Sequence, residues 1–231
     1  MPRYAAIDIG SNSVRMMAAE VDRQGTFQVL AEDRQVTRLG ESVFRTGSIN
    51  QSSFDLLSTV LQRMVATYKP LAPLAVRAVA TAAVRDASNG AEFLDLVSDV
   101  IGHPVELISG QEEARLIHLG VETRWPHPDE RILIVDIGGG SAEIIEADQS
   151  ILKVAFSRPL GAVRLHSTFL QNDPPSTSDL RRLQDFIDEK LSVVARRIPH
   201  GNFARAIGTS ASASAIVCAA NRIPRARRNE A

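Results

Sequence analysis

The chain has 231 residues, enough to bury a substantial core as one large domain or two modest ones. Its 26 Lys and Arg residues balance 27 Asp and Glu, so no overall basic field indicates a nucleic-acid partner and any anion must be bound locally. Cys218 is the only cysteine, which excludes an internal disulfide and favours the cytoplasm. Because no apolar run approaches the roughly eighteen residues of a membrane span, we expect a soluble protein with no membrane partner.

The first half of the chain alternates strand and helix patterns. Apolar residues at every second position predict strands, and apolar residues three and four apart predict helices. Residues 41–49 are expected to form a loop, in which Gly40 and Gly47 indicate a tight path of the chain. The expected elements are strands over residues 4–9, 14–21, 27–38, 74–81 and 105–108, and helices over 51–68, 91–101 and 109–121.

The second half begins after an irregular stretch, residues 122–130, whose prolines exclude regular structure and indicate a crossover between lobes. Cys218 stands in an apolar run and is expected to be a core residue rather than a nucleophile. The expected elements are strands over residues 132–147, 151–157 and 203–207, helices over 161–169, 180–198 (capped by Ser178) and 213–220, and a polar basic tail over 221–231.

The most informative stretch is residues 132–146, in which three glycines separate two apolar runs. It predicts two strands joined by a glycine turn whose N–H groups converge on one anion, because glycine carries no Cβ and tolerates positive φ. A hydroxyl at the rim and a carboxylate on each strand would place hard oxygens beside a phosphate, as Mg²⁺ requires. The alternative is an ordinary tight hairpin with an acid at either end. The residues concerned are Asp136, Gly138, Gly139, Gly140, Ser141 and Glu143.

The N-terminus repeats this pattern at a constant offset, since 136 − 8 = 128. Asp8 matches Asp136, Gly10 matches Gly138 and Ser13 matches Ser141. Two such hairpins, each opening about a hundred residues, predict a duplicated α/β architecture that clamps a ligand between the copies.

Four segments together resemble the exopolyphosphatase and guanosine pentaphosphate phosphohydrolase (Ppx/GppA) family of the actin-like ATPase superfamily, over nearly the whole chain. They are Asp8 to Ser13 with Arg15, Ala80 to Gly90, Ser109 to Leu116, and Asp136 to Glu143.

The resemblance implies an α/β fold of duplicated actin-like (ribonuclease H-like) lobes with a ligand cleft between them. The first lobe is expected over residues 1–124 and the second over 131–220, followed by the basic tail 221–231. The second lobe is expected to be incomplete, since the family's second lobe continues with another strand and helix. The family also carries further glycine where Ala211 and Ser212 stand here.

The resemblance also implies residue roles. Glu113 is the general base, although a glutamate in a first helical turn is also a common dipole complement. Ser109 and Glu112 have capping-box spacing, which would leave Glu113 available. Arg85 contacts substrate phosphate, with a surface pair to Asp86 as the alternative. Phosphate is held by Gly10, Ser11, Asn12, Ser13, Arg15, Arg85, Gly138, Gly139, Gly140 and Ser141, and Mg²⁺ by Asp8, Asp136 and Glu143.

The expected activity is release of terminal phosphate from inorganic polyphosphate, guanosine pentaphosphate or both. An actin-like ATPase or sugar kinase, and a polyphosphate or alarmone sensor without turnover, are the alternatives. An incomplete second lobe would expose Ile216 and Val217, so we expect self-association, for instance as a homodimer, or low stability. The five histidines show no metal-ligand spacing.

Overall fold

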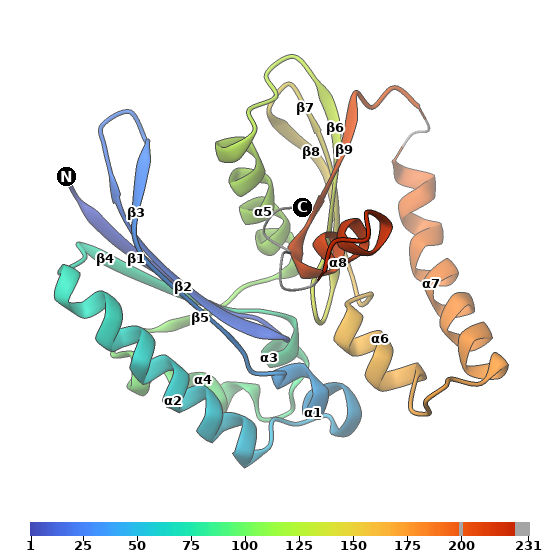
Figure 1. Ribbon diagram of the computed structural model, residues 1–231, viewed down its shortest axis with the longest axis horizontal. Coiled ribbons are helices and arrows are strands. Elements are labelled where there is room, and N and C mark those ends of the chain that lie inside the picture. The colour runs from blue at the N-terminus through green and yellow to red at the C-terminus, as the bar shows by residue number, and fades with distance from the viewer. Residues whose placement is uncertain (199–200, 225–231) are drawn as a thin grey trace. The chain divides into compact units, whose positions relative to one another are not determined.

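The computed structural model describes residues 1–198 and 201–224 and forms two compact units, Met1–Ile108 and Ser109–Ala231. Each unit is built around its own sheet (Figure 1). Residues 225–231 of the expected basic tail lie outside the described residues. Within the described part, no helix is both long and apolar enough to cross a bilayer.

The described part of the first unit has a five-stranded sheet in the order β3-β2-β1-β4-β5. The first three strands form the expected antiparallel meander, and β4 pairs in parallel with β1. Ala5, Ile7 and Ile9 are buried while the residues between them are exposed, so period-2 alternation decides which face forms the core. The strands are β1 (Arg3–Ile9), β2 (Ser13–Val21), β3 (Phe27–Val36), β4 (Ala75–Ala80) and β5 (Val105–Leu107).

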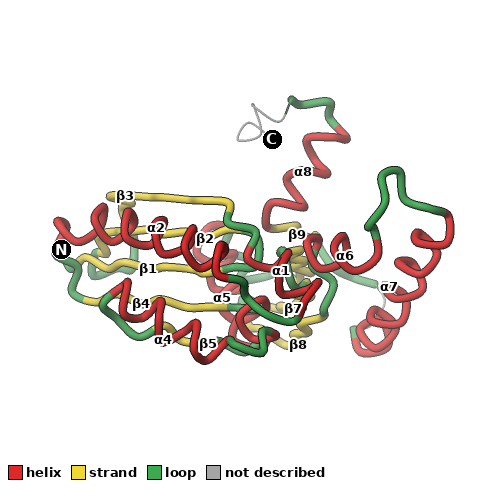
Figure 2. The backbone as a smooth tube through the Cα atoms, turned by 90° about the horizontal axis from the view of Figure 1, so that it is seen from below, coloured by secondary structure: helices red, strands yellow, loops and turns green. Residues whose placement is uncertain are grey.

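Two long helices, α2 (Gln51–Tyr68) and α4 (Gly90–Ile101), cover the core face of this sheet (Figure 2). The Asn50 side chain caps α2 by accepting a hydrogen bond from the Ser53 N–H at 2.9 Å. Shorter helices complete the unit: α1 (Leu39–Thr46), η1 (Lys69–Leu71) and α3 (Ala82–Asp86).

Helix α1 replaces the loop expected over residues 41–49, so that prediction was wrong. Leu39 and Val43 are buried one helical turn apart. The Gly40 N–H donates to the Ser11 carbonyl at 2.7 Å, and a Cβ at Gly40 would lie only 3.1 Å from that same oxygen. Gly40 therefore permits a close approach rather than a turn, while Gly47, at φ 80°, ends the helix.

The described part of the second unit has a four-stranded sheet in the order β8-β7-β6-β9. It repeats the connectivity of the first sheet, with an antiparallel meander followed by a strand that pairs in parallel with the first. This repetition agrees with the predicted duplication. The strands are β6 (Arg131–Ile137), β7 (Ala142–Asp148), β8 (Ile151–Arg158) and β9 (Arg205–Thr209).

Four helices accompany this sheet, with α5 and α7 on opposite sides of it (Figure 1). Helix α7 is capped by Ser176 rather than by the expected Ser178 and so begins at Thr177 instead of residue 180, because Ser176 and Asp179 form a reciprocal capping box. Cys218 in α8 is buried, as expected. The helices are α5 (Gly110–Arg124), α6 (Ala162–Phe169), α7 (Thr177–Arg197) and α8 (Ser210–Ala220).

Helix α5 belongs to the second unit, whereas the sequence placed it in a first lobe ending at residue 124. Its buried residues Ala114 and Val121 pack against a cluster on β6 and β7. The helix follows β5 along the chain, but its apolar face is buried by the other sheet. The cluster comprises Ile132, Ile134, Ile145 and Ala147, with Ile117, Leu152, Ala155 and Ile207 around it.

Candidate functional site

The first hairpin (residues 8–15) and the second hairpin (residues 136–143) have the same backbone closure. The Gly10 N–H donates to the Ser13 carbonyl at 3.2 Å, and the Gly138 N–H donates to the Ser141 carbonyl at 3.0 Å. This correspondence follows the offset of 128 residues found in the sequence.

The turn of the second hairpin is oriented by the start of α6. The carbonyls of Gly138 and Gly139 accept from the Ala162 and Arg164 N–H groups at 2.9 and 3.0 Å, and the Gly140 carbonyl accepts from Arg164 Nε at 2.6 Å. In a trans peptide the N–H points away from the preceding carbonyl, so the next three N–H groups face the side opposite α6. Such a row of N–H groups can bind an anion.

Close packing against this turn explains the glycine that precedes α6. A Cβ at Gly161, which precedes α6, would overlap the backbone of Gly139 and Gly140. In the described residues, glycines with positive φ occur at four positions away from both hairpins, namely Gly25, Gly47, Gly102 and Gly201. The positive φ considered for the turn glycines therefore does not occur there. Ser141 is buried and not at the rim.

The first hairpin is held in a comparable way by the segment that leads into α1. The Ser11 carbonyl accepts from Gly40, and the Asn12 carbonyl accepts from the N–H groups of Thr37 and Arg38, both at 3.0 Å. The N–H groups of Asn12 and Ser13 therefore face away from this segment. The buried Ser11 hydroxyl accepts from the Ala83 N–H at 3.1 Å, which joins the hairpin to α3.

Helix α3 brings Arg85 to the same end of the first sheet as the first hairpin. Strand β4 runs parallel to β1, so both strands end at this edge, and α3 follows β4 directly. Arg85 is half-buried and its Nη1 donates to the Ile108 carbonyl at 2.8 Å. On the neighbouring strands, Asp8 and Arg15 lie directly opposite each other and are exposed. The phosphate-binding residues predicted in the first unit therefore lie at the same end of its sheet.

The two acids of the second hairpin lie side by side, as predicted. Asp136 and Glu143 are directly opposed on β6 and β7, on the sheet face that α5 covers. Thr209 Oγ1 donates to Asp136 Oδ2 at 2.6 Å, and Ser157 Oγ donates to Glu143 Oε1 at 2.7 Å. Each carboxylate therefore has an oxygen fixed by a hydroxyl on a neighbouring strand.

The first turn of α5, which carries Glu113, begins next to these acids. Gly110 packs so closely on Ser157 that a Cβ would overlap the serine side chain, and Ser157 in turn hydrogen-bonds Glu143. Gln111 Nε2 also donates to the Ala155 carbonyl at 3.2 Å. The positive end of the helix dipole thus lies at the acidic end of the sheet, where an anion and a cation can both be stabilised.

Glu112 and Glu113 have different surroundings. The Ser109 hydroxyl accepts from the Glu112 N–H at 3.2 Å, which confirms Ser109 as the helix cap. Both Glu112 carboxylate oxygens, however, accept from Arg115, at 2.7 and 2.8 Å. Glu112 is therefore held by a bidentate pair with Arg115, and Glu113 Oε2 is shielded from solvent.

The donor set of the second unit fits Mg²⁺. Asp136 and Glu143 offer hard carboxylate oxygens from adjacent strands, and the hydroxyls of Thr209 and Ser157 would keep one oxygen of each in place. Asp8 occupies the position in the first unit that Asp136 occupies in the second.

Residues 17–226 match the Ppx/GppA phosphatase family. The chain belongs to this family. The match spans most of both units, which confirms the resemblance drawn from the four segments.

Solved structures of the same family are similar over nearly the whole chain. An exopolyphosphatase-like protein is 28% identical, with a TM-score of 0.90 over 96% of this chain and 70% of that one. An exopolyphosphatase from Cytophaga hutchinsonii is 26% identical, with a TM-score of 0.86 over 98% and 73%. The Aquifex aeolicus Ppx/GppA family member is 29% identical, with a TM-score of 0.75 over 97% and 71%. The duplicated α/β, actin-like fold is thereby confirmed.

Two contacts in this Ppx/GppA chain were missed by sequence reasoning. Thr209 follows a predicted strand, and its Gly-Thr-Ser context is a signal that could have pointed to the hairpin acids. Ser157 lies within a strand and carries no such signal, because only the pairing of β8 with β7 brings it opposite Glu143.

Proposed function

We propose that this chain hydrolyses phosphoanhydride bonds and releases terminal phosphate from inorganic polyphosphate, guanosine pentaphosphate or both. The observation that carries the proposal is the position of the first turn of α5, which carries Glu113, against the Asp136–Glu143 pair through Gly110 and Ser157. A general base beside a row of peptide N–H groups and a pair of acids is the arrangement that phosphoryl transfer to water requires.

In the proposed mechanism, Glu113 orients a water molecule and accepts its proton as the water attacks the terminal phosphorus in line with the leaving oxygen. The N–H groups of the second hairpin turn, those of Gly139, Gly140 and Ser141, hold the phosphoryl oxygens. Asp136 and Glu143 would hold Mg²⁺, which supplies positive charge to the phosphate oxygens when bound. No covalent intermediate is required.

Residues of the first unit are proposed to hold phosphate groups of the substrate. Arg85 and Arg15 suit this role because a guanidinium stays charged at any working pH and can contact two oxygens at once. Ser11, Asn12 and Ser13 are assigned to the same role through their N–H and hydroxyl groups, Gly10 as the turn residue whose N–H closes this phosphate-binding hairpin on Ser13, and Asp8 to Mg²⁺. A cytoplasmic location is part of the proposal and rests on the single cysteine.

The decisive experiment is phosphate release by the purified full chain, with polyphosphate, guanosine pentaphosphate and ATP assayed side by side, each with and without Mg²⁺. We expect Mg²⁺-dependent release from one or both of the first two substrates and little from ATP. Predominant ATP turnover would instead favour an actin-like ATPase. Tight binding of polyphosphate or guanosine pentaphosphate without release would favour a sensor.

A further inference from the structure

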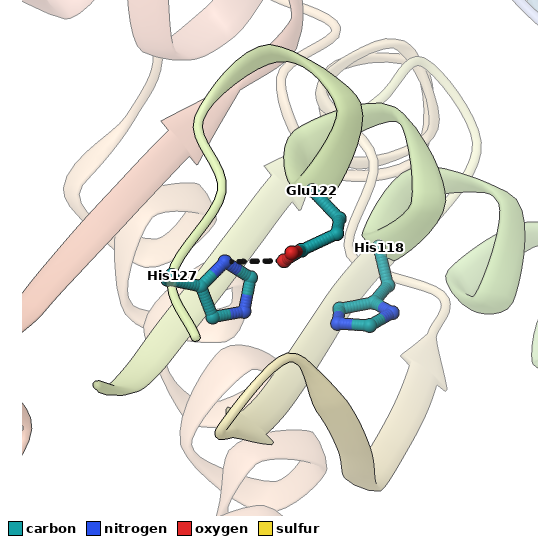
Figure 3. Close-up of side chains that lie close together, drawn as sticks. All are labelled: His118, Glu122 and His127. Atoms are coloured by element: carbon teal, nitrogen blue, oxygen red, sulfur yellow. Dashed lines mark ion pairs between the residues drawn. The ribbon is translucent and has the colours of Figure 1, made fainter. Parts of the chain in front are cut away.

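Three side chains at the C-terminal half of α5 converge in a way that the sequence spacing did not indicate. His118 and Glu122 lie four residues apart on one face of α5, and His127 lies in the connection between α5 and β6 (Figure 3). One nitrogen or oxygen from each lies within 4.8 Å of the others. The sequence spacing of the histidines, which showed no metal-ligand pattern, therefore did not reveal this cluster.

The cluster is preorganised by an ion-pair contact and a hydrogen bond. Glu122 Oε2 lies 2.7 Å from His127 Nδ1, and Glu122 Oε1 accepts from Ser150 Oγ at 2.7 Å. Ser150 belongs to the turn between β7 and β8, and the Gln149 N–H of that turn donates to the Glu130 carbonyl at 3.1 Å. The carboxylate is thus fixed on both sides, and three separate segments meet at it.

Hydrogen bonding alone leaves part of the cluster unsatisfied. His118 is 5% exposed and His127 is 1% exposed. The Nε2 atoms of both rings are buried without a hydrogen-bond partner among the described residues. If the His127–Glu122 pair served only to hold the connection, it would use His127 Nδ1 alone. The Nε2 atoms of His118 and His127 would then stay unpaired, which is unfavourable for buried polar atoms. A metal ion that accepts one lone pair from each Nε2 atom would remove that cost.

The chemistry of the set points to a borderline transition-metal ion. Imidazole nitrogens suit Zn²⁺, Co²⁺ and Ni²⁺ and are poor ligands for Mg²⁺ or Ca²⁺. A tetrahedral zinc site with bonds of about 2.0–2.1 Å places its ligand atoms about 3.4 Å apart, so small side-chain rotations suffice.

We propose that His118, Glu122 and His127 form a zinc-type metal site, with Ser150 orienting the carboxylate and a fourth position left for water. The bound ion would tie α5 to the α5–β6 connection. Because α5 also carries Glu113 at its other end, the ion would stabilise the helix that positions the proposed base. This site is separate in place and ligand chemistry from the Mg²⁺ ligands of the second hairpin.

The first test is metal binding by the full chain after chelator treatment, measured by titration with Zn²⁺ against a chromogenic chelator. We expect one Zn²⁺ per chain, no competition from Mg²⁺, and a melting temperature that rises with Zn²⁺. His118→Gln and His127→Gln should weaken binding by about 100-fold or more, since loss of even a hydrogen bond to a ligand costs about 10–100-fold. His103→Gln, which alters an exposed histidine of the first unit, is the matched control and should bind as the parent does.

The second test keeps the proposal falsifiable if a histidine variant fails to fold. Ser150→Ala removes only the bond to Glu122 Oε1 and should weaken Zn²⁺ binding by about 10–100-fold at unchanged stoichiometry. Co²⁺ should give the intense visible absorption of a tetrahedral site in the parent and not in Glu122→Gln. The proposal is overturned if the parent binds no stoichiometric Zn²⁺, or if a folded variant at either histidine binds Zn²⁺ as tightly as His103→Gln.

Discussion

At the scale of single residues, neighbouring glutamates in one helical turn are separated by their contacts. Glu112 is held by Arg115 through both carboxylate oxygens, whereas Glu113 lies one position further, in the turn that begins beside Ser157. A shift of one residue in a helix rotates a side chain by about 100°, so the two acids face different surroundings. Their substitution should therefore have different consequences.

We predict that Glu113→Gln lowers turnover by roughly 100-fold or more, because the amide keeps the shape but cannot accept a proton. Binding of polyphosphate should be nearly unchanged. Steady-state phosphate release and equilibrium binding, measured on the same preparation, check this expectation. Glu112→Gln is the matched control, and an equal loss of turnover in that variant would rule out the assignment of Glu113 as the base.

The paired acids of the second hairpin lead to a prediction about the dependence of the rate on Mg²⁺. Asp136→Asn and Glu143→Gln each remove one negative charge from the proposed ligand set while keeping the size of the side chain. Both should raise the Mg²⁺ concentration needed for half-maximal rate. The measurement is the rate as a function of Mg²⁺ at saturating substrate. If the parent rate does not depend on divalent ions and both variants match it, these acids only flank a hairpin.

At the scale of secondary-structure elements, the contact between α6 and the second hairpin depends on the absence of a side chain at Gly161. Gly161→Ala would force a Cβ into the Gly139–Gly140 backbone and should cost about 1–3 kcal/mol of stability. The shifted turn should also bind phosphate less well. Gly120→Ala is the control, because a Cβ there meets open space inside α5 and should stabilise the helix by about 0.5–1 kcal/mol. Denaturant unfolding of both variants tests the pair.

The capping box of α7 makes the stability depend on pH. The Ser176 hydroxyl, the Ser176 N–H and then Arg182 lower the pKa of the Asp179 carboxyl from its ordinary value of 3.8. Because the folded pKa is the lower one, the ionised cap stabilises the fold above the ordinary pKa, and this contribution is lost as the pH falls through the folded pKa. Asp179→Asn should therefore destabilise the chain near neutral pH and approach the parent at low pH.

Thermal melts between pH 7 and about pH 3 would test this dependence. Asp185→Asn, an exposed position on the same helix, serves as the control and should leave the pH profile of the parent unchanged. A constant difference in melting temperature between Asp179→Asn and the parent across this range would contradict the proposed role of the ionised cap.

At the scale of the whole molecule, α8 leaves apolar side chains on the surface. Ile216 is 62% exposed and Val217 is 44% exposed, as the sequence predicted for this helix. Apolar residues on one short helix favour association with a second copy of the chain, and self-association as a homodimer stays a prediction. Ile216→Ser should shift light-scattering mass toward the monomer.

Leu74→Ser, which changes a 73% exposed leucine of the first unit, is the control for this association and should have no effect on mass. The alternative consequence of the exposed face is a chain that is poorly stable and weakly active alone. A monodisperse monomer with a cooperative melt above about 55 °C and full hydrolytic rate would contradict both outcomes.

The sequence by itself determined the features that depend on neighbours along the chain. Alternation within the strands decided which residues of β1 face the core, and the length of the glycine turn placed Asp136 opposite Glu143. The repeat at 128 residues predicted two sheets with the same connectivity, which the structure confirms. These features are local because a hairpin register and a strand's two faces follow from a few consecutive residues.

The tertiary structure alone decided which elements pack together. The buried face of α5 could cover either sheet as far as periodicity shows, and packing against Ile134 and Ile145 placed Glu113 in the second unit. Ser157 meets Glu143 only through strand pairing, and His127 reaches His118 and Glu122 only through the path of an irregular connection. Apolar burial does not depend on direction or on sequence distance, so it joins segments whose proximity no local pattern encodes.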